Sequence, residues 1–288
     1  MDKRPYGNKD DQLSIIGFGG IVVKDTPPDE ASRLVGNAID SGINYFDVAP
    51  TYGNAEECLG PALEPYRNDV FLACKTGKRD KAGAEAELQN SLKLLRTDHF
   101  DLYQLHGVKS WEDYEQILGP GGALEAFVEA REKGLVRYLG FSAHSDTVAL
   151  ALMDQFDFDS ILFPFNWVNF LEVQWGPDVL EKAESKNMGR MALKALARGR
   201  IEKGQPRPYD RCWYEPVDDR DLADLVLRFT LSQSITAAVP PGDPGLFQMA
   251  VEIAQNFTPI TESEIQTLRE STHGVTPLAS QDWIVEAR

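Results

Sequence analysis

The chain has 288 residues, of which 42% are hydrophobic, and its 45 acidic and 29 basic side chains give a formal net charge of -16. A surface this acidic repels nucleic acid and anionic membranes, because phosphate binding needs clustered cations, so we expect neither as a partner. The three cysteines show no CxxC spacing, which argues against a disulfide framework and a structural zinc site.

The N-terminal segment and the hydropathy of the chain bear on its location. The opening residues, MDKRPYGNKDDQLSIIG, carry charges and never reach an apolar run long enough for a signal peptide. No later stretch approaches the length of a membrane span. Together with the cysteine usage, these features predict a cytoplasmic protein, and we expect no bound metal.

Short apolar runs alternate with longer segments of helical period, which is typical of repeated βα units around a parallel sheet. A length of 288 residues suits a (β/α)8 TIM barrel, whose usual size is about 250 residues. We therefore expect an α/β fold in which residues 1–288 form a single barrel domain. The eight predicted strands are residues 13–19, 43–46, 70–75, 100–105, 136–141, 160–163, 188–194 and 236–239.

Amphipathic segments between these runs predict the connecting helices. In one of them, Leu88, Leu92 and Leu95 recur at spacings of four and three, while charged residues occupy the other faces. Several segments end in a cation, a glycine or an asparagine, as helices commonly do. The helices predicted most clearly are residues 30–41, 84–95, 123–133 and 181–187.

Two segments interrupt this rhythm, and both follow predicted strands. Residues 165–177 combine aromatic residues with asparagines, and residues 204–219 are rich in proline, arginine and aromatic residues. Loops after barrel strands line the C-terminal mouth, where active sites are built, although a solvated surface connection is an equal alternative for the second segment. The aromatic residues that could wall a pocket there, or simply pack, are Trp167, Phe170, Trp175, Trp213, Tyr214 and Trp283.

Four ionisable side chains fall at or just beyond the ends of consecutive predicted strands. Asp47 and Tyr52 lie in GINYFDVAPTYGNAEECLG, Lys75 lies in VFLACKT, and His106 lies in FDLYQLHG. Because the ends of neighbouring parallel strands meet at one barrel mouth, we expect these side chains to share a site. Taken singly, each has an ordinary alternative as a capping, packing or solvated residue.

These motifs carry a resemblance to a known family. The chain resembles an aldo-keto reductase from residue 13 to about residue 252, most specifically in GINYFDVAPTYGNAEECLG and DLYQLHG. The resemblance implies a (β/α)8 barrel, a nicotinamide dinucleotide bound without a Rossmann fold, and hydride transfer to a small-molecule aldehyde or ketone. By motif match, Asp47, Tyr52, Lys75 and His106 occupy the four catalytic positions of the family.

Carbonyl reduction explains why these residue types belong together. Negative charge develops on the carbonyl oxygen, so the site must supply a proton and a positive field. A free tyrosine, with a pKa of about 10, is a weak acid at neutral pH. We expect Lys75 to lower the pKa of Tyr52, the proton donor, while Asp47 holds Lys75 in place. His106 would donate a hydrogen bond to the same substrate oxygen.

The segment VPPGDPGLFQMAVEIA resembles the phosphate and adenosine loop of the family. Its Pro-Gly pair would let the backbone approach a pyrophosphate at the start of the following helix. Residues 240–256 contain neither lysine nor arginine, although NADPH-preferring reductases normally grip the 2′-phosphate with a cation here. The resemblance favours NADPH, but the missing cation weakens that preference and indicates use of NADH, unless Lys194 or Arg198 supplies the charge.

The nicotinamide end departs from the family pattern as well. Ser142 matches the first residue of a Ser-Asn pair that binds the carboxamide, but Ala143 replaces the asparagine. Leu162 and Leu193 stand where the family has a glutamine and a stacking aromatic residue. The candidate cofactor contacts are Gly20, Ile21, Ser142, Leu196, Pro241, Gly242, Gln248 and Glu252, with His144, Asn166 and Lys194 as substitutes for the lost contacts.

Two other functions remain open at this stage. A dinucleotide-binding regulatory or sensor barrel with little turnover is favoured by the altered carboxamide contacts and opposed by the complete catalytic four. A barrel that uses Lys75 as a Schiff-base nucleophile is disfavoured, because Asp47 should keep that lysine charged.

Overall fold

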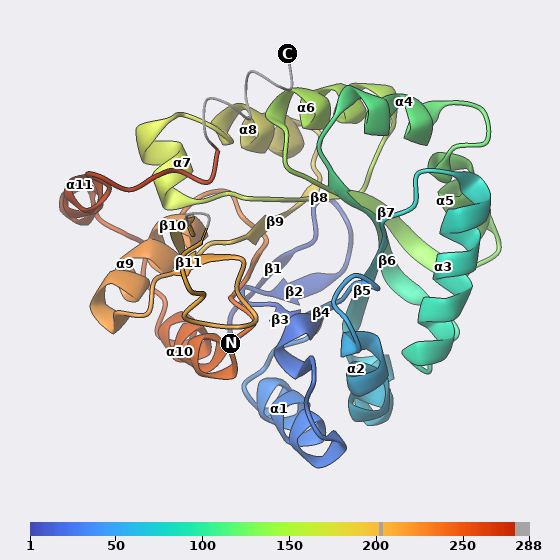
Figure 1. Cartoon of the computed structure of the whole chain (residues 1–288), viewed down its shortest axis with the longest axis horizontal. Coiled ribbons are helices and arrows are strands. Elements are labelled where there is room, and N and C mark those ends of the chain that lie inside the picture. Colours follow the sequence, from blue (N-terminus) through green and yellow to red (C-terminus); the bar gives the residue numbers. More distant parts are fainter. Residues whose placement is uncertain (202–203, 280–288) are drawn as a thin grey trace.

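The computed structural model describes residues 1–201 and 204–279. Eight parallel strands form one sheet in the order β3-β4-β5-β6-β7-β8-β9-β12. A parallel bridge between Ile16 and Ala238 joins its two edges, and the Ala238 amide donates to the Ile15 carbonyl at 2.9 Å. The predicted (β/α)8 barrel is therefore confirmed, and Figure 1 shows its helices arranged around the strands.

The barrel strands are β3 (Phe18–Gly19), β4 (Tyr45–Asp47), β5 (Phe71–Thr76), β6 (Phe100–Val108), β7 (Val136–Ala143), β8 (Ser160–Phe163), β9 (Gly189–Leu193) and β12 (Ala237–Val239). The helices in the described residues are α1 (Pro28–Asp40), α2 (Ala55–Leu63), α3 (Lys81–Leu94), α4 (Trp111–Leu118), α5 (Ala123–Glu132), α6 (Asp146–Gln155), α7 (Trp167–Glu172), α8 (Pro177–Ser185), α9 (Arg220–Leu231), α10 (Pro244–Gln255) and α11 (Glu262–Ser271). No helix in this described part is long and apolar enough to cross a membrane.

The barrel strands are buried on both faces, which explains their nearly continuous apolar sequences. Side chains alternate between the barrel interior and the helix-facing side. On the inward face, Tyr45, Phe71 and Leu102 belong to the apolar cluster that fills the lower barrel. The inward positions nearer the strand ends are polar, and they carry the candidate site.

One strand prediction was wrong in its pairing. Residues 13–19 do not form one barrel strand, because β2 (Gln12–Ser14) pairs antiparallel with β1 (Lys3–Pro5) and only β3 joins the barrel. The same apolar pattern fits pairing with β1 and pairing within the barrel. Periodicity alone therefore could not show where the hairpin strand ends and the barrel strand begins. Leu13 is fully buried in the interior cluster, and the hairpin covers the N-terminal end of the barrel.

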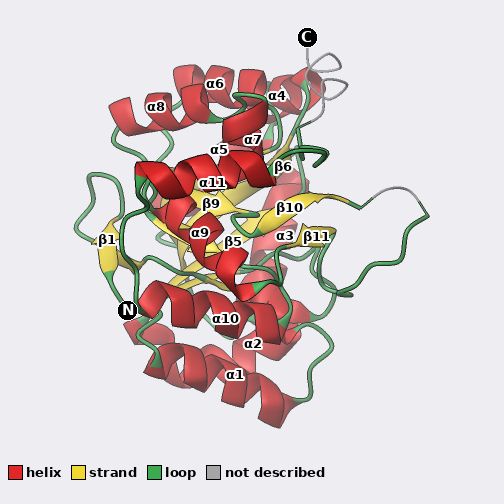
Figure 2. Cartoon of the chain, turned by 90° about the vertical axis from the view of Figure 1, so that its left-hand side faces the viewer, coloured by secondary structure: helices red, strands yellow, loops and turns green. Residues whose placement is uncertain are grey.

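The two aromatic segments also contain regular structure that the sequence did not predict. Residues 165–177 include α7, and residues 204–219 include β11 (Tyr214–Pro216), which pairs antiparallel with β10 (Ala197–Arg200). Figure 2 shows this β10–β11 pair at the end of the barrel opposite β1. The second segment thus lies at the C-terminal mouth, as expected for a loop that builds a site.

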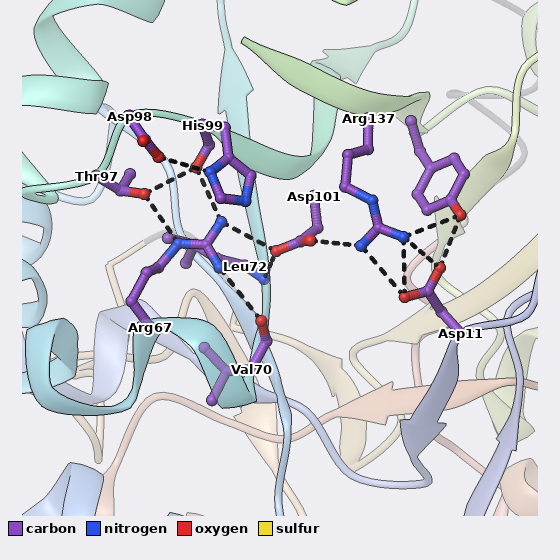
Figure 3. Close-up of polar contacts among 10 residues, drawn as sticks. Asp11, Arg67, Val70, Leu72, Thr97, Asp98, His99, Asp101 and Arg137 are labelled. Atoms are coloured by element: carbon purple, nitrogen blue, oxygen red, sulfur yellow. Dashed lines mark hydrogen bonds and ion pairs between the residues drawn. The ribbon is translucent and has the colours of Figure 1, made fainter. Parts of the chain in front are cut away.

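An ion-pair network closes the N-terminal end of the barrel near the start of β6 (Figure 3). Asp101 is 4% exposed, and its carboxylate lies 3.1 Å from Arg67 Nη2 and 2.8 Å from Arg137 Nη1. It also accepts a hydrogen bond from the Leu72 amide at 2.9 Å, and Arg137 continues the network to Asp11. Because the Asp101 carboxylate is buried, removing its charge would leave the charges of its arginine partners uncompensated.

We predict that Asp101→Asn lowers the free energy of unfolding by about 3 kcal/mol, because it leaves Arg67 without its buried counter-charge. Urea unfolding followed by circular dichroism measures this change. Asp98→Asn is the matched control, since that carboxylate is 94% exposed and pairs with neighbouring His99. Equal losses for the two variants would contradict the role assigned to Asp101.

Candidate active site

Three adjacent strands and one turn bring the four predicted side chains together. Asp47 ends β4, Lys75 lies on β5 and His106 lies on β6, while Tyr52 follows in the turn between β4 and α2. The Lys75 ammonium is fully buried, forms an ion pair with Asp47 Oδ1, and lies 3.5 Å from the Tyr52 hydroxyl. The rings of Tyr52 and His106 meet edge to face, with centroids 5.7 Å apart.

The Asp47 carboxylate is held by two further side chains that the sequence reasoning missed. Its Oδ2 accepts hydrogen bonds from the Tyr45 hydroxyl at 3.1 Å and from Gln104 Nε2 at 2.9 Å. Both residues lie two positions before a predicted site residue, on Asp47's own strand or on that of His106. Because strand side chains alternate, the inward face of each strand could have revealed them.

Burial controls the protonation of the central pair. Burial is the largest single effect on Lys75 and favours its neutral amine. The charges of Asp47 and Tyr52 and the hydrogen bond to Asp47 together exceed it and raise the pKa of this lysine above its usual value. For Tyr52, by contrast, burial raises the pKa, and the opposing effect of Lys75 is smaller. The expected lowering of the Tyr52 pKa was therefore wrong, because desolvation of the phenol exceeds the attraction of an ammonium that Asp47 already balances.

His106 is neutral at physiological pH. Burial, followed by the charges of Lys75 and Arg79, lowers the pKa of His106 to about 3. Its Nδ1 lies 3.2 Å from the Thr51 hydroxyl, another contact that strand-end reasoning missed. A neutral imidazole donates through one ring nitrogen and accepts through the other, so Thr51 is placed to select the tautomer.

The four side chains line a cavity of about 410 Å³ at the barrel mouth, here termed the main cavity. Ile21, Ser142, His144, Lys194 and Gly242 are the candidate cofactor contacts that line it in the described part of the chain. Leu162 and Leu193 contribute apolar wall, where the family pattern has a glutamine and an aromatic residue. The candidates outside this lining are Gly20, Asn166, Leu196, Pro241, Gln248 and Glu252.

Asn166 is a structural residue in this fold. It is fully buried, and its Nδ2 donates to the carbonyls of Lys194 at 2.9 Å and Ala197 at 2.8 Å. Its Oδ1 accepts a hydrogen bond from the Val168 amide at the start of α7. With both amide hydrogens used by the loop after β9, Asn166 has no donor left for a carboxamide, and that part of the expectation is corrected.

The loop before α10 combines a close backbone approach with negative charge. A Cβ on Gly242 would lie 2.6 Å from Ile21 Cγ2, so only glycine fits against η1 (Gly20–Val23). Asp243 caps α10 by accepting hydrogen bonds from the amides of Gly245 at 2.8 Å and Leu246 at 3.1 Å. The first donors of this helix are therefore already used by the chain's own carboxylate.

Gln248 and Glu252 lie on the exposed face of α10, away from the main cavity. Gln248 Nε2 donates to Glu252 Oε1 at 3.2 Å, and Glu252 Oε2 pairs with Arg220 Nη1 at 2.8 Å. Arg220 begins α9 and brings a cation to a segment that has none of its own. Sequence reasoning missed it because it lies outside residues 240–256.

The β10–β11 connection adds further residues to the mouth. Arg211 lines the main cavity and donates to the Val22 carbonyl and to the Thr26 hydroxyl. Trp213 is 55% exposed, and its ring centroid lies 6.2 Å from that of Tyr52. Among the predicted aromatic wall residues, Trp213 and Tyr214 line the main cavity, Trp167, Phe170 and Trp175 are buried, and Trp283 lies outside the described residues.

Comparison with known proteins agrees with this geometry. The model of the aldo/keto reductase family matches residues 15–272. The chain belongs to the aldo/keto reductase family of oxidoreductases. No group of three or more histidine, cysteine, aspartate or glutamate side chains in the described ranges is arranged to hold a metal ion.

Similar family members cover nearly the whole chain. Oxidoreductase YqkF of Bacillus subtilis is 28% identical, with 94% of this chain and 97% of that protein aligned. The holo form of an aldo-keto reductase from Bacillus halodurans superposes with a TM-score of 0.74 at 26% identity, covering 96% of this chain and 98% of its own. A glycerol dehydrogenase from Gluconobacter oxydans, at 22% identity and a TM-score of 0.70 over 96% of this chain and 98% of its own, shares the fold.

Proposed function

We propose that this chain reduces an aldehyde or a ketone to an alcohol with a hydride from NADPH or NADH, and that Tyr52 donates the proton. The observation that carries the proposal is the buried Lys75 ammonium between Asp47 and the Tyr52 hydroxyl at the base of the main cavity. The family membership and the holo form of the structural relative support a nicotinamide cofactor.

The residues of the mouth fit such a cofactor. Gly242 leaves room for close backbone approach, and Arg211 adds positive charge near that loop. Ser142 and His144 bring polar groups to the cavity wall, although the Ser142 hydroxyl already accepts from the Gly107 amide at 2.7 Å. The bound nicotinamide would supply the hydride, and the chain supplies orientation and the proton.

Proton transfer follows from the protonation states. Tyr52 remains protonated at neutral pH because burial raises its pKa, and the Lys75 charge stabilises the phenolate that forms once the proton leaves. As hydride from the bound nicotinamide reached the carbonyl carbon, Tyr52 would give its proton to the carbonyl oxygen. With the Thr51 hydroxyl donating to Nδ1, neutral His106 would keep its proton on Nε2 and donate it to the same oxygen.

Two other functions fit the site less well. A Schiff-base lysine must become neutral, whereas Asp47 raises the pKa of Lys75. A sensor barrel is favoured by one observation, the apolar Leu162 and Leu193 at positions of expected cofactor contacts. Such a sensor would bind the dinucleotide without steady turnover, which the following experiment distinguishes.

We predict that Tyr52→Phe lowers kcat for a panel of neutral aldehydes by about 10³-fold, because it removes the general acid. The Kd of the reduced cofactor, measured by fluorescence, should change little. Tyr66→Phe, at a partly buried tyrosine in η2 (Glu64–Asp69) outside the main cavity, is the matched control and should keep parental turnover. Cofactor binding by the parent with no steady oxidation of NADPH or NADH would favour the sensor, and an active Tyr52→Phe would refute the assigned donor.

The reduction rate should be flat from about pH 6 to pH 9 for a neutral aldehyde. Tyr52 must be protonated to donate, and its pKa is raised above the usual value of 10.0, so loss of the proton affects the rate only at higher pH. The pKa of His106 is lowered to about 3, so this residue stays neutral throughout. A profile of kcat/KM that falls with a midpoint between about pH 7 and pH 8 would contradict these protonation states.

The cofactor loop predicts weak discrimination between NADPH and NADH, with Kd values within about tenfold of each other. Arg220 is balanced by Glu252, and Asp243 adds negative charge beside the loop. Glu252→Gln frees Arg220 and should lower the Kd of NADPH while leaving that of NADH nearly unchanged. Titration with both cofactors tests this, and a parental NADPH advantage above about 100-fold would refute it.

A further inference from the structure

A second cavity, of about 230 Å³, lies beside the main cavity and is here termed the side cavity. The two cavities share four lining residues, His144, Lys194, Trp213 and Tyr214. The side cavity adds Trp175 and Arg200 to these walls. It therefore joins an enclosure with aromatic, aliphatic and cationic walls to the site that contains Tyr52.

Lys194 is held at the boundary of the two cavities by an unusual backbone conformation. Its φ is 60°, in the left-handed region that a lysine seldom adopts. Its carbonyl accepts hydrogen bonds from Asn166 Nδ2 and from the Ala197 amide, each at 2.9 Å. Such conformations persist where surrounding contacts determine them, and they cluster at binding sites.

The charge of Lys194 is unbalanced in the described part of the chain. Its ammonium donates no hydrogen bond and forms no ion pair there, whereas Lys75 pairs with Asp47 and Arg211 donates to backbone and hydroxyl oxygens. Burial, and then the charge of Arg200, lower the pKa of Lys194 to about 8, so it is still mostly protonated at pH 7.

The described lining of the two cavities offers this cation no free carboxylate. Asp47 is the one acidic residue in the described lining of the main cavity, and it is engaged by Lys75, while the side cavity has none. A protein with a formal net charge of -16 thus presents, among the residues that the structure describes, a cation without a counter-charge inside its mouth. A partly desolvated cation of this kind is stabilised by an anionic ligand.

We propose that the side cavity binds a carboxylate of the substrate through Lys194 while the substrate carbonyl lies at Tyr52. Arg200, whose guanidinium donates to the Leu278 carbonyl, adds positive charge beside Lys194. This inference rests on the proposed function and narrows its substrates to oxo acids. Lys194 follows β9 and Lys75 lies on β5, four strands away in the sheet of eight, so the two lysines face each other across the mouth. A molecule with a carbonyl at one end and a carboxylate at the other would place one group on each side of the mouth.

The dinucleotide phosphates are the other anions that could reach Lys194, because loops after the last two strands of such barrels often bind phosphate. The walls of the side cavity favour the substrate instead. Trp175, Trp213 and Tyr214 give it aromatic surfaces, which suit an organic carboxylate better than a strongly hydrated diphosphate. Its volume of about 230 Å³ accommodates one end of a small molecule.

Steady-state kinetics with paired substrates test the inference. The pairs are 4-carboxybenzaldehyde with 4-carbamoylbenzaldehyde, and 6-oxohexanoate with 6-oxohexanamide, which differ mainly in charge. We expect the parent to prefer the carboxylate of at least one pair by about tenfold or more in kcat/KM, and Lys194→Met to abolish that preference. Lys194→Arg keeps the charge and should retain most of it. Lys93→Met, on the exposed face of α3, controls for the change in net charge.

Cofactor titration separates the two sources of anion. If Lys194→Met raises the Kd of NADPH and NADH about tenfold and leaves the acid-to-amide ratio at its parental value, the lysine serves the dinucleotide and the inference is overturned. Absence of a carboxylate preference in both pairs overturns it as well. A loss of preference with unchanged cofactor Kd supports it.

Failure of the proposed function gives a different result. If the parent reduces neither member of either pair, carbonyl reduction fails as the function, and the side cavity is then tested by binding alone. Calorimetric titration with 4-(hydroxymethyl)benzoate and 4-(hydroxymethyl)benzamide measures this without turnover. Binding of the benzoate to the parent, lost in Lys194→Met and absent for the amide, supports the anion site, and equal binding of both compounds refutes it.

Discussion

The ion pair between Lys75 and Asp47 is the constraint on which the rest of the site depends. Both groups are buried in the barrel, where an isolated charge costs several kcal/mol of desolvation. The pair is tolerated because hydrogen bonds from Tyr45 and Gln104 satisfy the second carboxylate oxygen. The same arrangement places the ammonium beside the Tyr52 hydroxyl, so the contact that makes the buried lysine stable would also prepare the site for the proton transfer that we propose.

The barrel separates stability from chemistry along its strands. At the N-terminal end, the interior is filled by apolar side chains, and the Asp101 network ties neighbouring elements together. At the C-terminal end, the next inward positions are ionisable and open into the main cavity. The two ends are connected along each strand, because side chains alternate and every second residue points into the barrel. Substitutions at one end can therefore alter stability while the chemistry at the other end is preserved.

Charge is distributed unevenly between the surface and the mouth. The chain is strongly acidic overall, yet Lys75, Lys194 and Arg211 all line the main cavity. Lys75 pairs with Asp47, and Arg211 donates to the Val22 carbonyl. Among the described residues, Lys194 has no such partner, and we propose that a ligand binds it. An acidic exterior with a cationic mouth repels anions from most of the surface and leaves one favourable place for them.

The sequence by itself determined the barrel class, most strand positions and the convergence of Asp47, Lys75 and His106, because parallel strands deliver their C-terminal residues to one edge. Only the tertiary structure decided how the N-terminal apolar run divides, how far burial raises the pKa of Tyr52, and that Asn166 supports Lys194 instead of facing the cavity. These outcomes depend on desolvation and on partners distant in sequence, such as Arg220 for Glu252, which local patterns do not encode.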